Sequence, residues 1–125
     1  MIISKQLSPY YVIGILNSEL SNFWYSKFGY DYHGEKTKKY EPEKAEKYLI
    51  PIKLSSKEDY ENLILRVNDI IKLYNELYRT HKETDKYNEI IKEIERQTVN
   101  IDVLVYKIYN IDNDNKNLIK KYLEA

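Results

Sequence analysis

The residues of this sequence that could carry out acid–base or metal chemistry are few and widely separated. His33 and His81 are its two histidines, and neither stands at metal-ligand spacing from a second ligand. The chain has no cysteine, which excludes disulfides, thiolate metal sites and cysteine nucleophiles. Its three glycines cannot form a phosphate-binding loop. We therefore expect no catalytic residue, no metal and no cofactor, and predict that this chain alone is not an enzyme.

One acidic stretch, residues 112–116, and one isolated carboxylate, Asp102, are candidate sites. Residues 112–116, Asp-Asn-Asp-Asn-Lys, resemble a calcium loop but lack its glycine and terminal glutamate, so a helix cap explains them better. Asp102 lies among apolar residues that cover most of the helix circumference, so its carboxylate must be at least partly buried and hydrogen-bonded. No second reactive group accompanies it. We predict that Asp102 is a structural acceptor that holds a neighbouring loop or a tyrosine hydroxyl.

Lysines alternate with aromatic residues between residues 29 and 47, a stretch that Gly29, Gly34 and Pro42 interrupt. Such a loop could contact phosphates through its lysines and stack bases on its aromatic rings. The candidate DNA-binding residues are Tyr30, Tyr32, His33, Lys36, Lys38, Lys39 and Tyr40. Glutamates in the same stretch dilute its positive charge. A solvated loop without a binding role is an equal alternative.

The composition is that of one small domain, residues 1–125. Lys plus Arg equals Asp plus Glu at 20 each, so the net charge gives no global attraction to nucleic acid or anionic lipid. The apolar runs are too short to span a membrane, and the N-terminus lacks the pattern of a secretory signal. We therefore expect a cytoplasmic protein without a membrane partner. The 14 tyrosines could stack on bases, but an AT-rich genome explains their number as well.

The elements that position these residues are dominated by two long helical seams. Between residues 60 and 108, seam residues recur in alternating steps of three and four, which places one residue per turn on one helix face. The first seam is Tyr60, Leu63, Val67, Ile70, Tyr74, Leu77 and His81; the second is Tyr87, Ile91, Ile94, Thr98, Ile101, Val105 and Ile108. The residues that we expect to be largely buried are Val67, Ile70, Tyr74, Ile94, Ile101 and Val105.

A polar interruption separates the two seams. The step of six from His81 to Tyr87 fits no continuous seam, and Thr84 or Asp85 could cap a new helix. We predict helices over about 58–82 and 85–109, folded into an antiparallel hairpin. The alternative is one unbroken helix of about 75 Å, at 1.5 Å per residue, because the gap contains neither Gly nor Pro.

Shorter elements complete the prediction. Ser8-Pro9 predicts the start of a helix over 8–28 that Gly29 ends. Gly14 within it indicates a close approach to a neighbour. The apolar stripe of this helix is Val12, Ile13, Leu16, Leu20, Phe23, Trp24 and Phe28. We expect residues 29–54 to form a loop followed by a short extended segment near 48–54. We expect residues 115–124 to form a short helix.

The predicted fold class is therefore mainly α. A long antiparallel helical hairpin, residues 58–110, packs on the N-terminal helix. The short extended segment and the short C-terminal helix complete a single domain.

Three segments resemble the TaqI-like C-terminal specificity domain of type IIG restriction–modification enzymes and adenine-specific DNA methyltransferases. Residues 10–20, Tyr-Tyr-Val-Ile-Gly-Ile-Leu-Asn-Ser-Glu-Leu, match the family's "yy-x-x-g-i-LNS-x-l" helix. Residues 49–52, Leu-Ile-Pro-Ile, match its "l-x-PI" segment, and residues 101–111 match "ID-x-LVY-x-LYgL". In order and spacing, the segments cover nearly the whole chain. Asn110 replaces the family's usual glycine and also tolerates a left-handed cap.

The resemblance implies a non-catalytic DNA-specificity module, or a fragment of one, that supports target-sequence recognition. Methyl transfer and cleavage lie elsewhere in such enzymes, and this sequence lacks the methyltransferase Asn-Pro-Pro-Tyr motif and the Pro-Asp nuclease pattern. The implied partners are double-stranded DNA, bound weakly or through the complete enzyme, and the methyltransferase or endonuclease portion. The alternative is a helical-hairpin protein–protein interaction or scaffold module without DNA contact. A homodimer also remains open.

Overall fold

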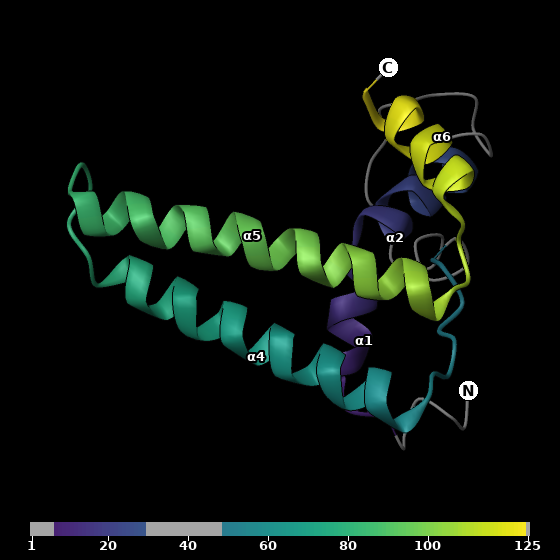
Figure 1. Ribbon diagram of the computed structural model, residues 1–125, viewed down its shortest axis with the longest axis horizontal. Helices are drawn as coiled ribbons and strands as arrows, with labels where there is room; N and C mark the ends of the chain where they lie inside the picture. The colour runs from purple at the N-terminus through teal and green to yellow at the C-terminus, as the bar shows by residue number, and fades with distance from the viewer. Residues whose placement is uncertain (1–6, 30–48, 125) are drawn as a thin grey trace.

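The computed structural model describes residues 7–29 and 49–124, and these residues are helical almost throughout. The elements in order are α1 (Pro9–Leu16), α2 (Glu19–Trp24), a π-helical turn η2 (Tyr25–Gly29), α4 (Lys57–Tyr78), α5 (Asp85–Ile108) and α6 (Asn113–Glu124). The two described ranges contain no strand. Helices α4 and α5 lie side by side and antiparallel, and α1 crosses them near one end (Figure 1). The predicted mainly-α fold is confirmed.

The hairpin begins and turns at capped helix ends. The Ser56 hydroxyl accepts the N–H of Asp59 at 3.1 Å at the start of α4, and the Thr84 hydroxyl accepts the N–H of Tyr87 at 3.1 Å at the start of α5. Glu83, just before the second cap, has a φ of 69°. This left-handed residue reverses the chain, so the alternative of one unbroken helix is wrong.

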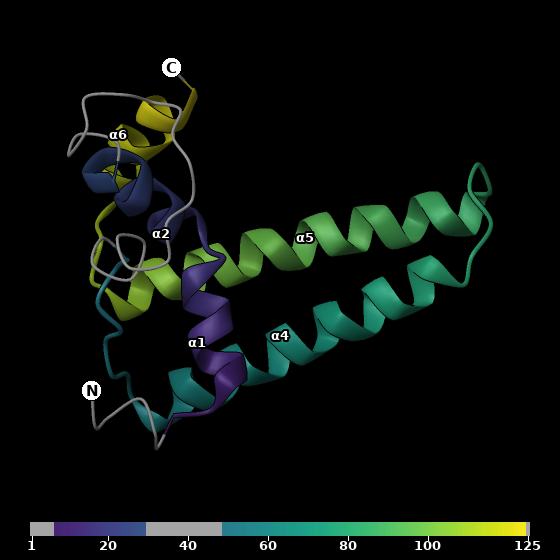
Figure 2. The same ribbon diagram turned by 180° about the vertical axis from the view of Figure 1, so that it is seen from behind.

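The main core lies at the end of the hairpin where the shorter helices pack, which we call the base. Helix α1 crosses α4 at Gly14, where an added Cβ would lie 2.9 Å from side-chain atoms of Leu63 and of Val67. The predicted close approach at this glycine is confirmed. The buried cluster consists of Tyr11, Ile15, Leu20, Ile50, Leu63, Val67, Ile101, Val105, Tyr106, Ile108 and Ile119. Figure 2 shows α2 and α6 together beyond the C-terminal end of α5.

The predicted continuous helix over 8–28 is wrong, because the chain breaks at Asn17 and Ser18. The Ser18 hydroxyl donates to the carbonyl of Ile15 at 2.6 Å and accepts the N–H of Ser21 at 3.2 Å. A serine side chain that satisfies backbone groups in this way ends one helix and caps the next. The break lets α1 and α2 point in different directions, as Figure 2 shows.

The predicted apolar stripe of this segment is also partly wrong. Tyr11, Gly14 and Ile15 form the buried face of α1, whereas Ile13 is 43 % exposed. The buried set follows the i, i+3, i+4 spacing of a helix that packs through Gly14. Leu20 is buried and Phe23 and Trp24 pack against the core as predicted. The side chain of Phe28 lies outside the part of the chain that the structure describes.

Four of the six predicted seam residues are buried: Val67, Ile94, Ile101 and Val105. The prediction is wrong for Tyr74, which is 43 % exposed, and Ile70 is only half-buried. Both line an open groove beside α1. A seam residue is buried by two helices only on the side where they meet, and no third element of the described ranges covers the other side here.

The segment before α4 has neither helix nor strand and is held by tyrosine hydroxyls. Tyr11 donates to the carbonyl of Lys53 at 2.6 Å, and Tyr109 donates to the carbonyl of Pro51 at 2.7 Å. The N–H of Lys53 donates back to the Tyr109 hydroxyl at 3.1 Å. The N–H of Ser8 likewise donates to the Tyr60 hydroxyl at 2.7 Å. These tyrosines fix backbone that regular secondary structure leaves unpaired.

The C-terminal helix starts one turn after α5. Asn110 takes a left-handed φ of 56° beyond the end of α5, as a C-terminal cap requires. Asp112 Oδ1 then accepts the N–H of Asn115 at 2.8 Å, which confirms the cap interpretation of residues 112–116. None of the helices in the described ranges combines the length and apolarity needed to cross a bilayer.

Candidate functional site

The structure places only some of the predicted site residues. The proposed DNA-contact residues, Tyr30, Tyr32, His33, Lys36, Lys38, Lys39 and Tyr40, all lie outside the described residues. His81 is exposed in the turn between α4 and α5. Among the residues that are described, no group of three or more His, Cys, Asp or Glu side chains could hold a metal ion. Asp102 is therefore the starting point for a candidate site among the described residues.

Asp102 connects α5 to the start of α2. Its Oδ1 accepts the backbone N–H of Glu19 at 2.9 Å, so a half-buried carboxylate lies against the positive end of a helix. Burial raises the pKa of Asp102 above its ordinary value of 3.8, and the hydrogen bond from Glu19 opposes that shift. The donor is the first residue of α2 rather than a tyrosine hydroxyl. Asp102 thus acts as an acceptor that fixes the break between α1 and α2.

A second hydrogen bond ties the same two helices together. The Tyr106 hydroxyl donates to Glu19 Oε1 at 2.6 Å, and Tyr106 is 2 % exposed. Burial, and then this bond to a carboxylate, raise the pKa of Tyr106 well above its ordinary value. Lys116 of α6 lies over the tyrosine ring, 5.6 Å from its centroid. Sequence reasoning missed this pair, although Tyr106 follows Asp102 by four residues and therefore shares its helix face.

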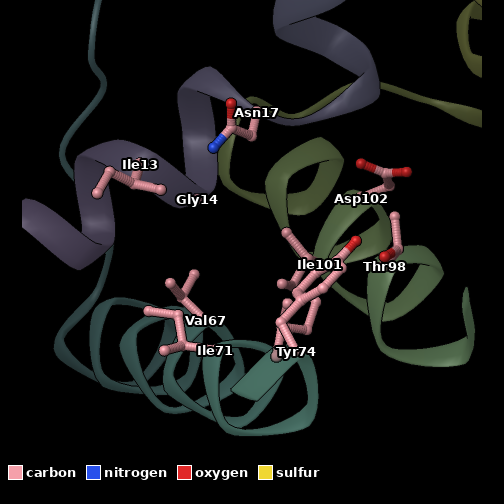
Figure 3. A pocket seen from close by; sticks show the side chains of 10 residues that line it. Ile13, Gly14, Asn17, Val67, Ile71, Tyr74, Thr98, Ile101 and Asp102 are labelled. Carbon is pink, nitrogen blue, oxygen red and sulfur yellow. The ribbon is translucent and has the colours of Figure 1, made fainter. Parts of the chain in front are cut away.

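An apolar groove of about 400 Å³ opens beside Asp102, between α1 and the hairpin (Figure 3). Its lining residues are Ile13 and Gly14 of α1, Asn17 just after α1, Val67, Ile70, Ile71 and Tyr74 of α4, and Thr98, Ile101 and Asp102 of α5. In Figure 3, Val67 and Ile71 lie across the open space from Ile13 and Gly14. The polar side chains of the lining are Asn17, Thr98 and Asp102, and the α4 wall is apolar apart from the Tyr74 hydroxyl.

Asp102 also lines a wider, more polar hollow of about 780 Å³ on the side of α2. The lining of that hollow includes Ser18, Glu19 and Asn22, together with Leu49 and Leu123. Asn17 and Asp102 contribute to both openings. The carboxylate that fixes α2 therefore remains accessible to a ligand.

The groove has the size and lining of a ligand-binding pocket. Its lining contains no histidine, cysteine or lysine, and Asp102 is its one carboxylate. Its volume falls at the lower end of the roughly 300–1,000 Å³ of typical ligand pockets, and its apolar floor with few polar groups is typical of them.

Comparison with known proteins assigns this chain to no family. No family model, no curated protein and no solved structure matches it.

Proposed function

We propose that this chain is a non-catalytic DNA-specificity module of a type IIG restriction–modification enzyme. In this function it supports target recognition inside a larger cytoplasmic enzyme, while methyl transfer and cleavage take place in other parts of that enzyme. The proposal rests on the three segments that resemble the TaqI-like specificity domain, residues 10–20, 49–52 and 101–111.

The observation that supports the proposal best is that these three segments contact one another. The hydrogen bonds of Asp102 and Tyr106 to Glu19 join the third segment to the first. The hydrogen bond from Tyr109 to the carbonyl of Pro51 joins the third segment to the second. The motif residues therefore act together as one packing unit at the base of the hairpin. Residues that a family shares for packing would be expected to meet in this way.

The arrangement also favours a supporting role over direct readout of bases. Base recognition needs preorganised donor and acceptor side chains that reach a groove of the duplex. The described surface offers instead a packed base from which α4 and α5 extend together (Figure 1). Two long helices joined in this way can hold a recognition surface at a fixed distance from a catalytic portion.

The proposal is tested by DNA binding of the full chain across a salt series. The expected interactions are between DNA phosphates and Lys36, Lys38 and Lys39, so binding should be weak and insensitive to sequence. Replacing all three lysines by Ala should weaken binding, and the salt slope should fall by about 0.9 for each phosphate that the variant no longer neutralises.

The matched control removes three exposed lysines near the turn of the hairpin, Lys82, Lys86 and Lys92. It changes the net charge by the same amount, so it separates a local contact from a general charge effect. An equal decrease in affinity for both triple variants would contradict contact by the 29–47 loop. A parent chain without DNA affinity even at low salt would contradict the DNA function and favour the scaffold alternative.

A further inference from the structure

We propose that the groove between α1 and the hairpin docks an amphipathic helix of a partner protein, whose arginine or lysine reaches Asp102. This inference goes beyond the proposed DNA function and does not depend on it. The occupant is a helix that presents an apolar face to α4 and a basic edge to α5.

The groove has room for a second helix beside α1. Helix α1 already packs on this face of the hairpin, and beside it the face stays open along Ile70, Ile71 and Tyr74. The open strip lies beside a packed helix, and neighbouring helices pack about 8–10 Å apart. A second helix beside α1 would extend the layer that α1 begins.

Several apolar side chains that line the groove are exposed to solvent. Ile13 is 43 % exposed, Ile71 39 % and Tyr74 43 %, and all three line the same groove. Single exposed apolar residues are common on protein surfaces, but a concave cluster from two helices is typical of an interaction site. Helix-in-groove binding places anchors at i, i+3, i+4 and i+7 in such a cluster.

The charge of the rim identifies the chemistry of the partner. Glu95 precedes Asp102 by seven residues and Thr98 by three, so helix periodicity places it on the same side of α5 as these two lining residues, although it does not itself line the groove. Neither carboxylate forms an ion pair with any residue in the described ranges. Lys120 of α6 lowers the Asp102 pKa through its charge, but it makes no ion pair there.

A basic helix fits this rim better than the other classes of partner. The groove lining contains no lysine or arginine, so an acidic helix or a nucleic-acid phosphate would meet the Asp102 carboxylate and no positive charge. A guanidinium can bind a carboxylate through two parallel hydrogen bonds, and Asp102 uses only Oδ1 in its bond to Glu19. Surrounding apolar residues would strengthen that contact by excluding water.

The test measures binding of two designed helical peptides to the full chain by fluorescence anisotropy. Both peptides carry leucines at i, i+4, i+7 and i+11; one has arginines along one edge of that face, and the other has glutamines there. The arginine peptide should bind roughly tenfold more tightly, as expected for one charge-assisted contact. The Asp102→Asn variant, which keeps an acceptor for Glu19, should bind both peptides equally.

A second pair of variants tests the groove without touching Asp102. Ile71→Gln should weaken binding of both peptides about tenfold, because it places a polar side chain on the apolar wall. Leu65→Gln is the matched control: Leu65 is 60 % exposed on the same helix but does not line the groove, so the affinity of this variant should not change.

Three results would overturn the proposal. They are equal affinity of the parent chain for the two peptides, no binding of either peptide at millimolar concentration, and equal effects of Ile71→Gln and Leu65→Gln. Circular dichroism of each variant shows whether it is folded. If Asp102→Asn does not fold, the proposal is decided by two other results. These are the parent's relative affinity for the two peptides and the difference between the effects of Ile71→Gln and Leu65→Gln on binding.

Discussion

The base of the hairpin and its tip, the end at the turn between α4 and α5, are built from the same kind of seam, yet they are packed very differently. At the base, Leu63 and Val105 are fully buried because α1 adds a third layer. Toward the tip, α4 and α5 face only each other within the described chain, and Tyr78 is 82 % exposed. A heptad-like pattern therefore predicts which residues face a partner helix, whereas their burial depends on what covers the sides of the helix pair that the partner leaves open.

The interactions at the two ends also differ in kind. The base is joined by hydrogen bonds between residues far apart in sequence, such as Tyr106 to Glu19 and Tyr109 to Pro51. Nearer the tip, the seam residue Ile94 and its neighbour Ile90 are buried but lie outside the main core cluster. The ion pair between Lys86 and Glu76 there is 3.5 Å long and exposed. Most of the stability should therefore reside at the base.

The largest expected effect comes from removing a core side chain at the base. Leu63→Ala should lower the free energy of unfolding by about 3–5 kcal/mol, because α1 packs on this residue through Gly14 and the cavity cannot collapse easily. Ile90→Ala is the matched change toward the tip, and it should cost only about 2 kcal/mol because two helices can close on the gap more readily. Urea unfolding measures both. Equal decreases in stability would contradict the contrast between base and tip.

A smaller effect should appear in the pH dependence of stability. Because burial raises the pKa of Asp102, the folded chain holds this proton more tightly than the unfolded chain. Stability should therefore fall as pH rises from the ordinary value of 3.8 through the folded-state pKa.

Asp102→Asn removes this titration while keeping an acceptor for Glu19. The Tm of Asp102→Asn relative to the parent should therefore rise between about pH 3 and about pH 7. Parallel thermal scans of the two proteins provide the measurement. A Tm difference that stays constant over that range would show that Asp102 is not desolvated.

The smallest effect should come from the exposed ion pair near the tip. Lys86→Ala should change the free energy of unfolding by no more than about 0.5 kcal/mol, because Lys86 and Glu76 are both largely solvated. Urea unfolding in low and high salt measures this effect. A decrease above about 1 kcal/mol would mean that the tip is stabilised by electrostatics rather than by its seam.

The sequence predicted the hairpin well because its signals are local. The cap at Thr84 or Asp85 and the close approach at Gly14 both follow from nearby residues, and the structure confirms them, with Thr84 as the cap. The break after Leu16 was not predicted, since Ser18 can either continue a helix or cap the next one. At the same break, Asp102 of the distant helix α5 accepts the N–H of Glu19.

The groove could not be predicted for a related reason. The pattern assigned Tyr74 and Ile70 to the buried seam, and both do lie on the face turned toward α5 and α1. Whether they are covered depends on how far α1 extends over the hairpin, and α1 ends at Leu16, before the break at Asn17 and Ser18. An open site of this kind is a product of packing between distant elements rather than of local spacing.

Native-state hydrogen exchange along α4 tests most directly the claim that the hairpin is held at its base. Amides around Leu63 should exchange only through global unfolding, whereas those around Leu77 and Tyr78 should exchange through local opening of the tip. If the hairpin is held at its base, protection of the α4 amides from exchange should fall steadily from the base to the tip, and Leu63→Ala should lower protection at the base. Uniform protection along the whole of α4 would contradict it.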